Sequence, residues 1–275
     1  ILTMQQNLTV SRVAARINGA WVSLTTGMSG TVYKILPDNQ RNRIYFAGLY
    51  STAGNVLVNN FCYWDSGSNI FRACGTTGTG GAIYDMANEP NGDVWIVGDF
   101  TTAGGAATRG VSKYLANTNS FTNFNTTSSL GGWRCVTVDQ NNKIYVGGIT
   151  TNFNGVTTES FMVSYYNGSW STLSTTPFVY PSETPYTATV DYANNLIVGS
   201  IQAGTTNGAV RKWDQNIWSV IATANTGGSI YSITKTRDAN ILIGGIYTKL
   251  GSVFSNNVSL YNGSNIVPLD GGVGG

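Results

Sequence analysis

A short apolar strand that ends in glycine, or once in serine, recurs five times along the chain, and this repetition constrains the fold more than any single residue. The five copies occupy 44–48, 95–98, 145–148, 197–200 and 242–245. Their last positions (48, 98, 148, 200, 245) are separated by 50, 50, 52 and 45 residues. Such a period is typical of four-stranded propeller blades. We therefore expect an array of one supersecondary unit.

Each copy lies in the same order of four expected strands. An apolar run comes first, at 32–36, 83–87, 133–138, 186–190 and 230–234. A polar turn leads from it to the glycine-ending strand, and a hairpin with Asn or Asp next to Gly, such as Asn167-Gly168, supplies the last two strands. These residues suit turns that need a positive φ. A glycine pair such as Gly80-Gly81 then leads to the next unit, and no amphipathic helical pattern appears in the sequence.

The expected fold is an all-β β-propeller of five complete blades plus the outer half of a sixth. The half-blade falls at 1–29 and the blades at 30–79, 80–130, 131–183, 184–226 and 227–270. A single domain over 1–275 fits this length better than two. Because the chain starts at Ile1 and ends in a glycine-rich connector, we expect it to be a segment of a longer protein, with the missing inner half-blade after Gly275.

The composition indicates a neutral surface rich in hydroxyl and amide groups. Charged residues make up 10% of the chain, against about a quarter in average proteins. The 15 Lys and Arg residues are scattered and the net charge is +2, which argues against nucleic acid as a partner. No apolar stretch in the sequence is long enough to insert into a membrane, and the first residues do not resemble a signal segment.

Cysteines and glycosylation sequons give limited information on the compartment. Pairing about a turn at 66–69 would place Cys62 and Cys74 nearly opposite each other, so they could form a disulfide or remain buried thiols. Cys135 is expected in the core. Asn-x-Ser/Thr sequons favour an extracellular setting, although hairpin turns alone explain two of them, Asn167 and Asn262. The sequons are at Asn7, Asn125, Asn167, Asn257 and Asn262.

The repeated elements YVGG, FTxAGG and W/Y-D/N-G resemble those of Kelch-type and galactose-oxidase-like β-propellers. The resemblance is greater to the propeller arrays of secreted, cell-surface and virus or phage structural proteins, and it covers nearly the whole chain. It implies a rigid propeller but no particular activity. The sequence contains no histidine, so the imidazole ligands of a copper oxidase are missing. The S-x-D-x-G-x-T-W boxes of sialidase-like propellers are missing as well.

The residue content excludes most common types of catalytic site. Without histidine, the Ser-His-Asp and Cys-His arrangements and ordinary zinc or copper sites are excluded. Seven of the 13 carboxylates fall at turns, where they have a structural explanation: Asp38, Asp65, Asp93, Asp139, Asp191, Asp214 and Asp238. A glycosidase pair would have to come from the other six, which are Asp85, Glu89, Asp99, Glu159, Glu183 and Asp270. Asp85 and Asp99 are the best placed, but a structural role is favoured even for them. We expect no metal and no cofactor.

Aromatic residues offer the best binding candidates. The seven tryptophans lie at or beside repeat positions and are expected to pack between blades. The connector at 174–186 is longer than its counterparts, contains three of the six prolines, and places aromatic residues where other blades have glycine pairs. It could be a preorganised contact surface or a flap over a blade junction. With the loop at 103–109 on the same face, the candidate binding residues are Phe178, Tyr180, Glu183, Tyr186 and Arg109.

Two classes of function remain. The first is a non-catalytic interaction or structural module on a cell or virus particle surface, with a protein partner or assembly neighbour. The second is glycan engagement, by a lectin or a carboxylate-based glycan-cleaving enzyme; a ring of tyrosines and tryptophans at one mouth of the propeller would favour it. We expect a partner to bury the connector face or the open edge of the half-blade, because unpaired strand edges recruit strands.

Overall fold

The structure is a computed structural model that describes residues 10–124, 132–149, 152–153, 156–157, 162–173, 183–202, 207–269 and 272–273. These residues form strands, turns and loops, and no helix occurs among them. The chain divides into two compact units, Ile1–Phe124 and Asn125–Gly275, which are described separately. Within the described ranges, no helix could cross a membrane.

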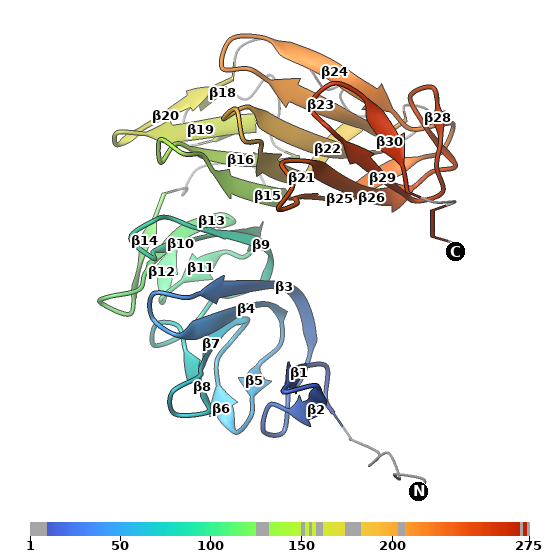
Figure 1. Ribbon diagram of the computed structural model, residues 1–275. Coiled ribbons are helices and arrows are strands. Elements are labelled where there is room, and N and C mark those ends of the chain that lie inside the picture. Colours follow the sequence, from blue (N-terminus) through green and yellow to red (C-terminus); the bar gives the residue numbers. More distant parts are fainter. Residues whose placement is uncertain are drawn as a thin grey trace, which may run out of the picture. The chain divides into compact units, whose positions relative to one another are not determined.

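The first unit contains two blades of four antiparallel strands, drawn from blue to green in Figure 1. The first blade has the strand order β3-β4-β7-β8, with bounds Thr31–Asp38, Arg43–Leu49, Phe61–Asp65 and Ile70–Ala73. The second has the order β9-β10-β13-β14, with bounds Ala82–Asn88, Val94–Asp99, Val111–Leu115 and Ser120–Asn123. A separate hairpin of β1 (Ala14–Ile17) and β2 (Ala20–Ser23) precedes them.

The second unit contains three further blades (Figure 1). The third blade is β15-β16-β19-β20, with bounds Trp133–Val138, Ile144–Gly148, Met162–Tyr166 and Ser169–Thr172. The fourth is β21-β22-β23-β24, with bounds Glu183–Val190, Leu196–Gln202, Ala209–Trp213 and Trp218–Thr223. The fifth is β25-β26-β29-β30, with bounds Ser229–Lys235, Ile241–Ile246, Val258–Tyr261 and Ile266–Pro268.

The all-β propeller fold with five four-stranded blades is therefore confirmed. The β1–β2 turn has the same left-handed geometry as a blade hairpin: φ is 51° at Asn18 and 83° at Gly19, against 48° at Asn167 and 83° at Gly168. This hairpin is thus built like the last two strands of a blade. The fourth blade starts at Glu183, one residue before the expected boundary. The single-domain organisation stays a prediction.

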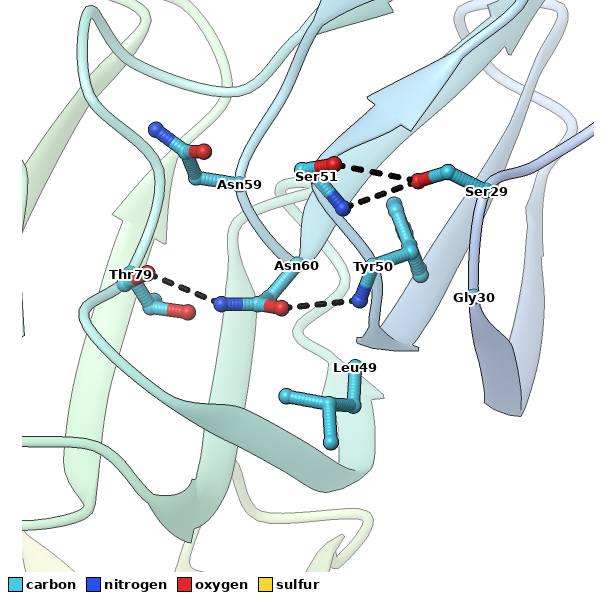
Figure 2. A pocket seen from close by; sticks show the side chains of 8 residues that line it. All are labelled: Ser29, Gly30, Leu49, Tyr50, Ser51, Asn59, Asn60 and Thr79. Carbon is cyan, nitrogen blue, oxygen red and sulfur yellow. Dashed lines mark hydrogen bonds between the residues drawn. The ribbon is translucent and has the colours of Figure 1, made fainter.

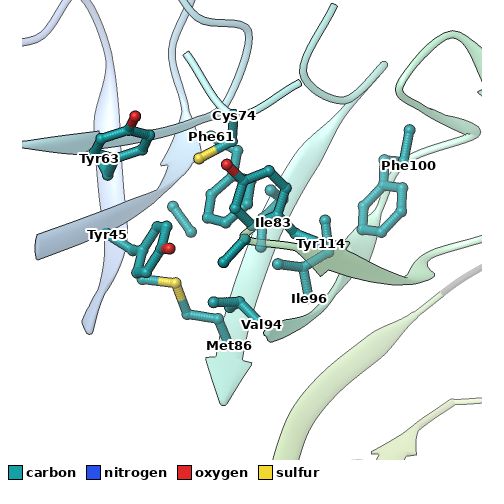
Figure 3. Packing of buried hydrophobic residues seen from close by; sticks show 13 residues of the cluster. Tyr45, Phe61, Tyr63, Cys74, Ile83, Met86, Val94, Ile96, Phe100 and Tyr114 are labelled. Carbon is teal, nitrogen blue, oxygen red and sulfur yellow. The ribbon is translucent and has the colours of Figure 1, made fainter. Parts of the chain in front are cut away.

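Side chains of adjacent blades pack together within each unit. The first strands of neighbouring blades contact each other, β3 with β9, β15 with β21 and β21 with β25. In the first unit, a buried cluster combines Tyr45 and Phe61 of the first blade with Ile83, Ile96 and Tyr114 of the second (Figure 3). The second strands contribute most to burial, because their apolar residues are covered on both faces. This packing places the ends of the first strands near one another.

Short two-residue strands extend from four blades. They form the pairs β5–β6 (Thr52–Ala53, Val56–Leu57), β11–β12 (Thr102–Ala103, Ala106–Ala107), β17–β18 (Asn152–Phe153, Val156–Thr157) and β27–β28 (Lys249–Leu250, Val253–Phe254). Three of them bridge to the connector that enters their own blade, through Met28–Ala53, Thr79–Ala103 and Ala224–Leu250. The loops after the second strand therefore hold the incoming connectors in place.

Candidate functional site

Every first strand carries a β-bulge at the same place. In each blade, the pairing with the second strand skips one residue. The skipped residues are Tyr33, Tyr84, Arg134, Tyr186 and Tyr231. A bulge re-aims the side chain of its extra residue. Four of the five blades thus present a tyrosine from the same position; we call Tyr33, Tyr84, Tyr186 and Tyr231 the bulge tyrosines.

The glycine that ends the second strand accounts for part of this geometry. A Cβ atom added to Gly48 would lie 2.0 Å from the carbonyl oxygen of Thr31, and one added to Gly98 would lie 2.1 Å from that of Ala82. At Gly245 the distance to the Ser229 oxygen would also be 2.1 Å. The two backbones approach so closely beside the bulge that the recurring glycine is a structural requirement there.

In the first unit, the two bulge tyrosines contact each other. The ring centroids of Tyr33 and Tyr84 are 5.4 Å apart, with an angle of 58° between the ring planes. Tyr33 is 47% exposed, while the half-buried Tyr84 donates a hydrogen bond from its hydroxyl to the Asp99 carboxylate at 3.0 Å. Next to them, the Lys34 ammonium pairs with the Asp85 carboxylate at 2.7 Å. The result is an aromatic surface flanked by charged groups.

The second unit repeats the aromatic pair. The ring centroids of Tyr186 and Tyr231 are 5.5 Å apart and the rings are nearly perpendicular, at 84°. Tyr231 is 43% exposed, and Tyr186 is half-buried. The half-buried Arg134 occupies the bulge of β15, the strand that contacts β21. Exposed ring faces of this kind can stack on sugars, on other aromatic groups or on cations.

Both carboxylates of the best-placed candidate pair, Asp85 and Asp99, have partners in the structure. Asp85 is bound by Lys34 and also accepts the backbone N–H of Met86, and Asp99 accepts the Tyr84 hydroxyl. Five turn aspartates confirm their expected role, since each accepts two backbone N–H groups in its own turn: Asp38, Asp65, Asp139, Asp191 and Asp214. No metal-binding group of three or more His, Cys, Asp or Glu residues occurs in the described part of the chain.

Of the five binding residues expected from the sequence, the structure places only Tyr186 among the bulge tyrosines. Phe178 and Tyr180 lie outside the described residues. Arg109 is half-buried in the loop before β13. The other three bulge tyrosines are not among the residues expected from the sequence, although a recurring Gly-x-Val/Ile-Tyr pattern, at 30–33, 81–84 and 228–231, marks their positions.

Glu183 requires a correction, because it is not a surface contact residue. It begins β21 and is 2% exposed. Its Oε1 atom accepts hydrogen bonds from the Ser200 hydroxyl and the Arg211 guanidinium, whereas Oε2 is buried without a partner. The residue therefore belongs to a buried ion pair of the fourth blade.

Of the two alternatives expected for Cys62 and Cys74, the structure shows buried thiols and no disulfide. Cys62 is opposite Ala73, not Cys74, in the β7–β8 register. Because successive side chains of a strand alternate between faces, the one-residue offset sends the two thiols into different clusters. Both are free and buried, as is Cys135.

Tryptophans and sequons follow expectation in part. Trp95 and Trp133 are fully buried, but Trp21 in the β1–β2 hairpin is 63% exposed, which corrects the expectation that all seven pack between blades.

Asn167 and Asn262 are exposed at hairpin turns. Asn257 is half-buried, and its side-chain amide donates to the Val273 carbonyl. Asn7 and Asn125 lie outside the described residues.

Comparison with protein families gives one match. The sequence model of the family described as "Rax2 C-terminal beta propeller domain" matches residues 7–184. This supports a β-propeller repeat family, without support for the Kelch-type assignment in particular. No curated protein sequence matches the chain.

Several solved structures share the fold. One is the extracellular domain of a protein described as a hybrid two-component system from B. thetaiotaomicron, with a TM-score of 0.60 and 14% identity over 88% of this chain and 28% of that one. A GH74 xyloglucanase from Xanthomonas campestris has a TM-score of 0.59 and 14% identity over 90% of this chain and 40% of that one. The chain thus spans less than half the length of these two proteins.

A third similar structure is an inactive histidine-to-alanine variant of virginiamycin B lyase from Staphylococcus aureus with quinupristin. Its TM-score is 0.53, with 13% identity over 87% of this chain and 70% of that one. At these identities the comparisons establish the fold alone. The similar propellers include both enzymes and an extracellular domain.

Proposed function

The chain belongs to the Rax2 C-terminal β-propeller family, and we propose that it is a non-catalytic binding module of an extracellular protein that holds its partner against the bulge tyrosines. The observation that carries this proposal is the bulge itself. Five blades share it, and four of them place a tyrosine there. Aromatic residues with exposed faces are typical of binding surfaces.

Burial alone does not account for these tyrosines. Tyr33 and Tyr231 keep 47% and 43% of their surface exposed, so a polar or smaller side chain would fit the same positions. Aromatic side chains whose rings already contact each other lose little conformational freedom when a ligand binds, because the rings are already ordered. The Tyr33–Tyr84 and Tyr186–Tyr231 pairs have this arrangement.

The extracellular setting and the non-catalytic role have separate support. One similar structure is an extracellular domain, and the sequon residues Asn167 and Asn262 are exposed. The similar lyase is described as catalytically inactive once a histidine is replaced by alanine, and this sequence has no histidine. Both Asp85 and Asp99 already have partners.

Binding of the labelled chain to intact cells and to extracellular matrix tests the proposal. Replacing all four bulge tyrosines by Ala should abolish binding. A matched control replaces Tyr166 and Tyr192, which are 46% and 52% exposed elsewhere in the second unit, and should bind as the unaltered chain does. Equal binding by the fourfold variant would refute the role of the bulge tyrosines.

Turnover is tested on the same preparations. Release of reducing ends from polysaccharides should stay at background for the unaltered chain and for the Asp85→Asn/Asp99→Asn variant. Hydrolysis that is lost in the double variant would instead establish the glycan-cleaving alternative.

A further inference from the structure

Two pockets occupy equivalent places in the first and fifth blades. The first-blade pocket is about 400 Å³ and is shown in Figure 2; the fifth-blade pocket is about 130 Å³. Each lies between the connector into the blade, the end of the second strand and the asparagine before the third strand. The corresponding lining residues are Gly30 and Gly228, Leu49 and Ile246, Tyr50 and Tyr247, and Asn60 and Asn257.

The same hydrogen bonds fix the floor of both pockets. In the first blade, Asn60 accepts the backbone N–H of Tyr50 at 2.9 Å and donates to the Thr79 carbonyl at 2.9 Å (Figure 2). In the fifth, Asn257 accepts the N–H of Tyr247 at 3.1 Å and donates to the Val273 carbonyl at 2.8 Å. The two tyrosine hydroxyls donate to the carbonyls of Phe46 and Ile243. Both pockets are therefore preorganised.

The walls carry no charge and mix polar with apolar surface, with apolar surface predominant in the fifth blade and one exposed apolar side chain at each mouth. Ser29, Ser51 and Asn59 supply hydroxyl and amide groups in the first blade, and Asn225 and Thr248 do so in the fifth. Among the described residues that line the pockets, none is charged. Leu49 is 52% exposed and Ile246 is 60% exposed. Such walls match a ligand with hydroxyl groups on its edge and C–H groups on its face.

Both pockets lie at the bulge end of the first strand. Leu49 pairs with Thr31, two residues before Tyr33, and Ile246 pairs with Ser229, two residues before Tyr231. A volume of about 400 Å³ is within the ordinary range of small-ligand sites, roughly 300 to 1,000 Å³. The first-blade pocket can thus accept one or two sugar rings, and the fifth-blade pocket a smaller part of a ligand.

We propose that these two pockets bind a neutral saccharide, which names the ligand class of the proposed function and rests on it. Hydroxyl groups of the sugar pair with the Ser51 and Asn59 side chains in the first blade and with Asn225 and Thr248 in the fifth, and its C–H face packs on Leu49 or Ile246. Asn60 and Asn257 already use both ends of their amides within the protein. A charged sugar would find no counter-charge among the described lining residues.

Titration calorimetry of the whole chain with maltotriose, cellotriose, mannotriose and chitotriose tests the assignment. We expect at least one to bind, and expect Leu49→Lys/Ile246→Lys to weaken it by about tenfold or more, about 1.4 kcal/mol. The control Leu57→Lys/Ile217→Lys changes the same residue types at positions that are 66% and 57% exposed, and should leave the affinity unchanged. Thermal unfolding checks that all variants are folded.

The outcomes separate this inference from the proposed function. Saccharide binding that survives in Leu49→Lys/Ile246→Lys but is lost in the fourfold tyrosine variant overturns the pocket assignment alone. No saccharide binding, with tyrosine-dependent binding to cells or matrix intact, overturns the saccharide class alone. Failure of both assays overturns both.

Discussion

The first and fourth blades fill the same three positions near the bulge in opposite ways. The first position lies two residues before the residue that precedes the bulge pairing shift, which is Val32 in the first blade and Pro185 in the fourth. It is occupied by Gly30 in the first blade and by Glu183 in the fourth. The second position, near the end of the second strand, is Gly48 in the first blade and Ser200 in the fourth. On the third strands, Cys62 is opposite Phe46, and Arg211 is opposite Val198.

Each blade forms a consistent set. In the first, an added Cβ would lie 2.1 Å from the Leu49 oxygen at Gly30 and 2.0 Å from the Thr31 oxygen at Gly48, and Cys62 packs in an apolar cluster. In the fourth, the carboxylate of Glu183 is satisfied on one oxygen by Ser200 and Arg211. Both blades nevertheless have a tyrosine at the bulge. Interior packing therefore does not dictate that tyrosine, which agrees with a binding role.

The largest effect should follow from removing the cation of the fourth blade. Arg211→Met leaves the carboxylate of Glu183, which is 2% exposed, without its counter-ion. Breaking a buried pair on one side costs about 3–5 kcal/mol, measurable as a loss of unfolding free energy in urea. Glu183→Met/Arg211→Met should recover most of that loss, since an apolar pair leaves no buried charge. A single-variant loss below about 1 kcal/mol would show that the pair is not truly buried.

Exchanging the strand-ending residues should give a smaller and asymmetric effect. Gly48→Ser forces a Cβ against the Thr31 oxygen, which as overpacking should cost about 1–3 kcal/mol. Ser200→Gly removes the hydroxyl that bonds Glu183 and the backbone of Ala209, at about 1 kcal/mol for a typical hydrogen bond. Urea unfolding measures the loss of unfolding free energy in each variant. A greater loss for Ser200→Gly than for Gly48→Ser would contradict the steric requirement for glycine at position 48.

Thiol chemistry can probe Cys62, which occupies the third position in the first blade, together with the other two cysteines. Burial raises the pKa of Cys62 to about 12 and that of Cys74 well above its usual value, so neither should react with Ellman's reagent in the folded protein. After unfolding without a reductant, three thiols should titrate, from Cys62, Cys74 and Cys135. Titration of one thiol alone would establish the disulfide that the register excludes.

The smallest effect should come from the outer hairpin turns, which the two blades build alike. Hydrogen bonds from the side chain and backbone of Ser68 lower the pKa of Asp65 from 3.8 to about 2, and backbone N–H groups of Ile217 and Asn216 lower that of Asp214. A depressed pKa in the folded state adds stability above the unfolded value, and this stability is lost as the pH falls through the folded value.

Asp65→Asn should accordingly lower Tm slightly at pH 7, and its Tm should converge with that of the unaltered chain as the pH falls from about 4 to about 2. Thermal unfolding across this range is the measurement, and Asp214→Asn should behave in the same direction. A difference that persists unchanged at pH 2 would contradict the role of the carboxylate charge.

Much of the fold was readable from the sequence because it repeats. Glycine near the end of the second strand in four of the five blades, and Asn or Asp in the hairpins, mark positions that the backbone itself requires. The contacts between side chains of paired strands depend on the strand register, and these contacts could not be predicted from the sequence. A shift of one residue moves a side chain to the other face, and this offset separated Cys62 from Cys74.

The candidate site was only partly predictable for the same reason. Glu183 and Arg211 are 28 residues apart and meet only once β21, β22 and β23 are paired. The sequence indicates Tyr186 through its place at the end of the proline-rich connector at 174–186, not through its bulge. The bulges become evident only from the pairing, although the recurrence of tyrosine at one place in the repeat was present in the sequence.

The central claim is that the bulge tyrosines serve binding and not packing, and the most direct test measures both properties in the two blades compared. For Tyr33→Ala and Tyr186→Ala, the dissociation constant for the cell or matrix surface and the unfolding free energy in urea should be determined on the same samples. We predict binding weakened by about tenfold or more, with unfolding free energy changed by less than about 1 kcal/mol. Unchanged binding together with a loss of about 3 kcal/mol, as for a buried aromatic residue, would contradict the account.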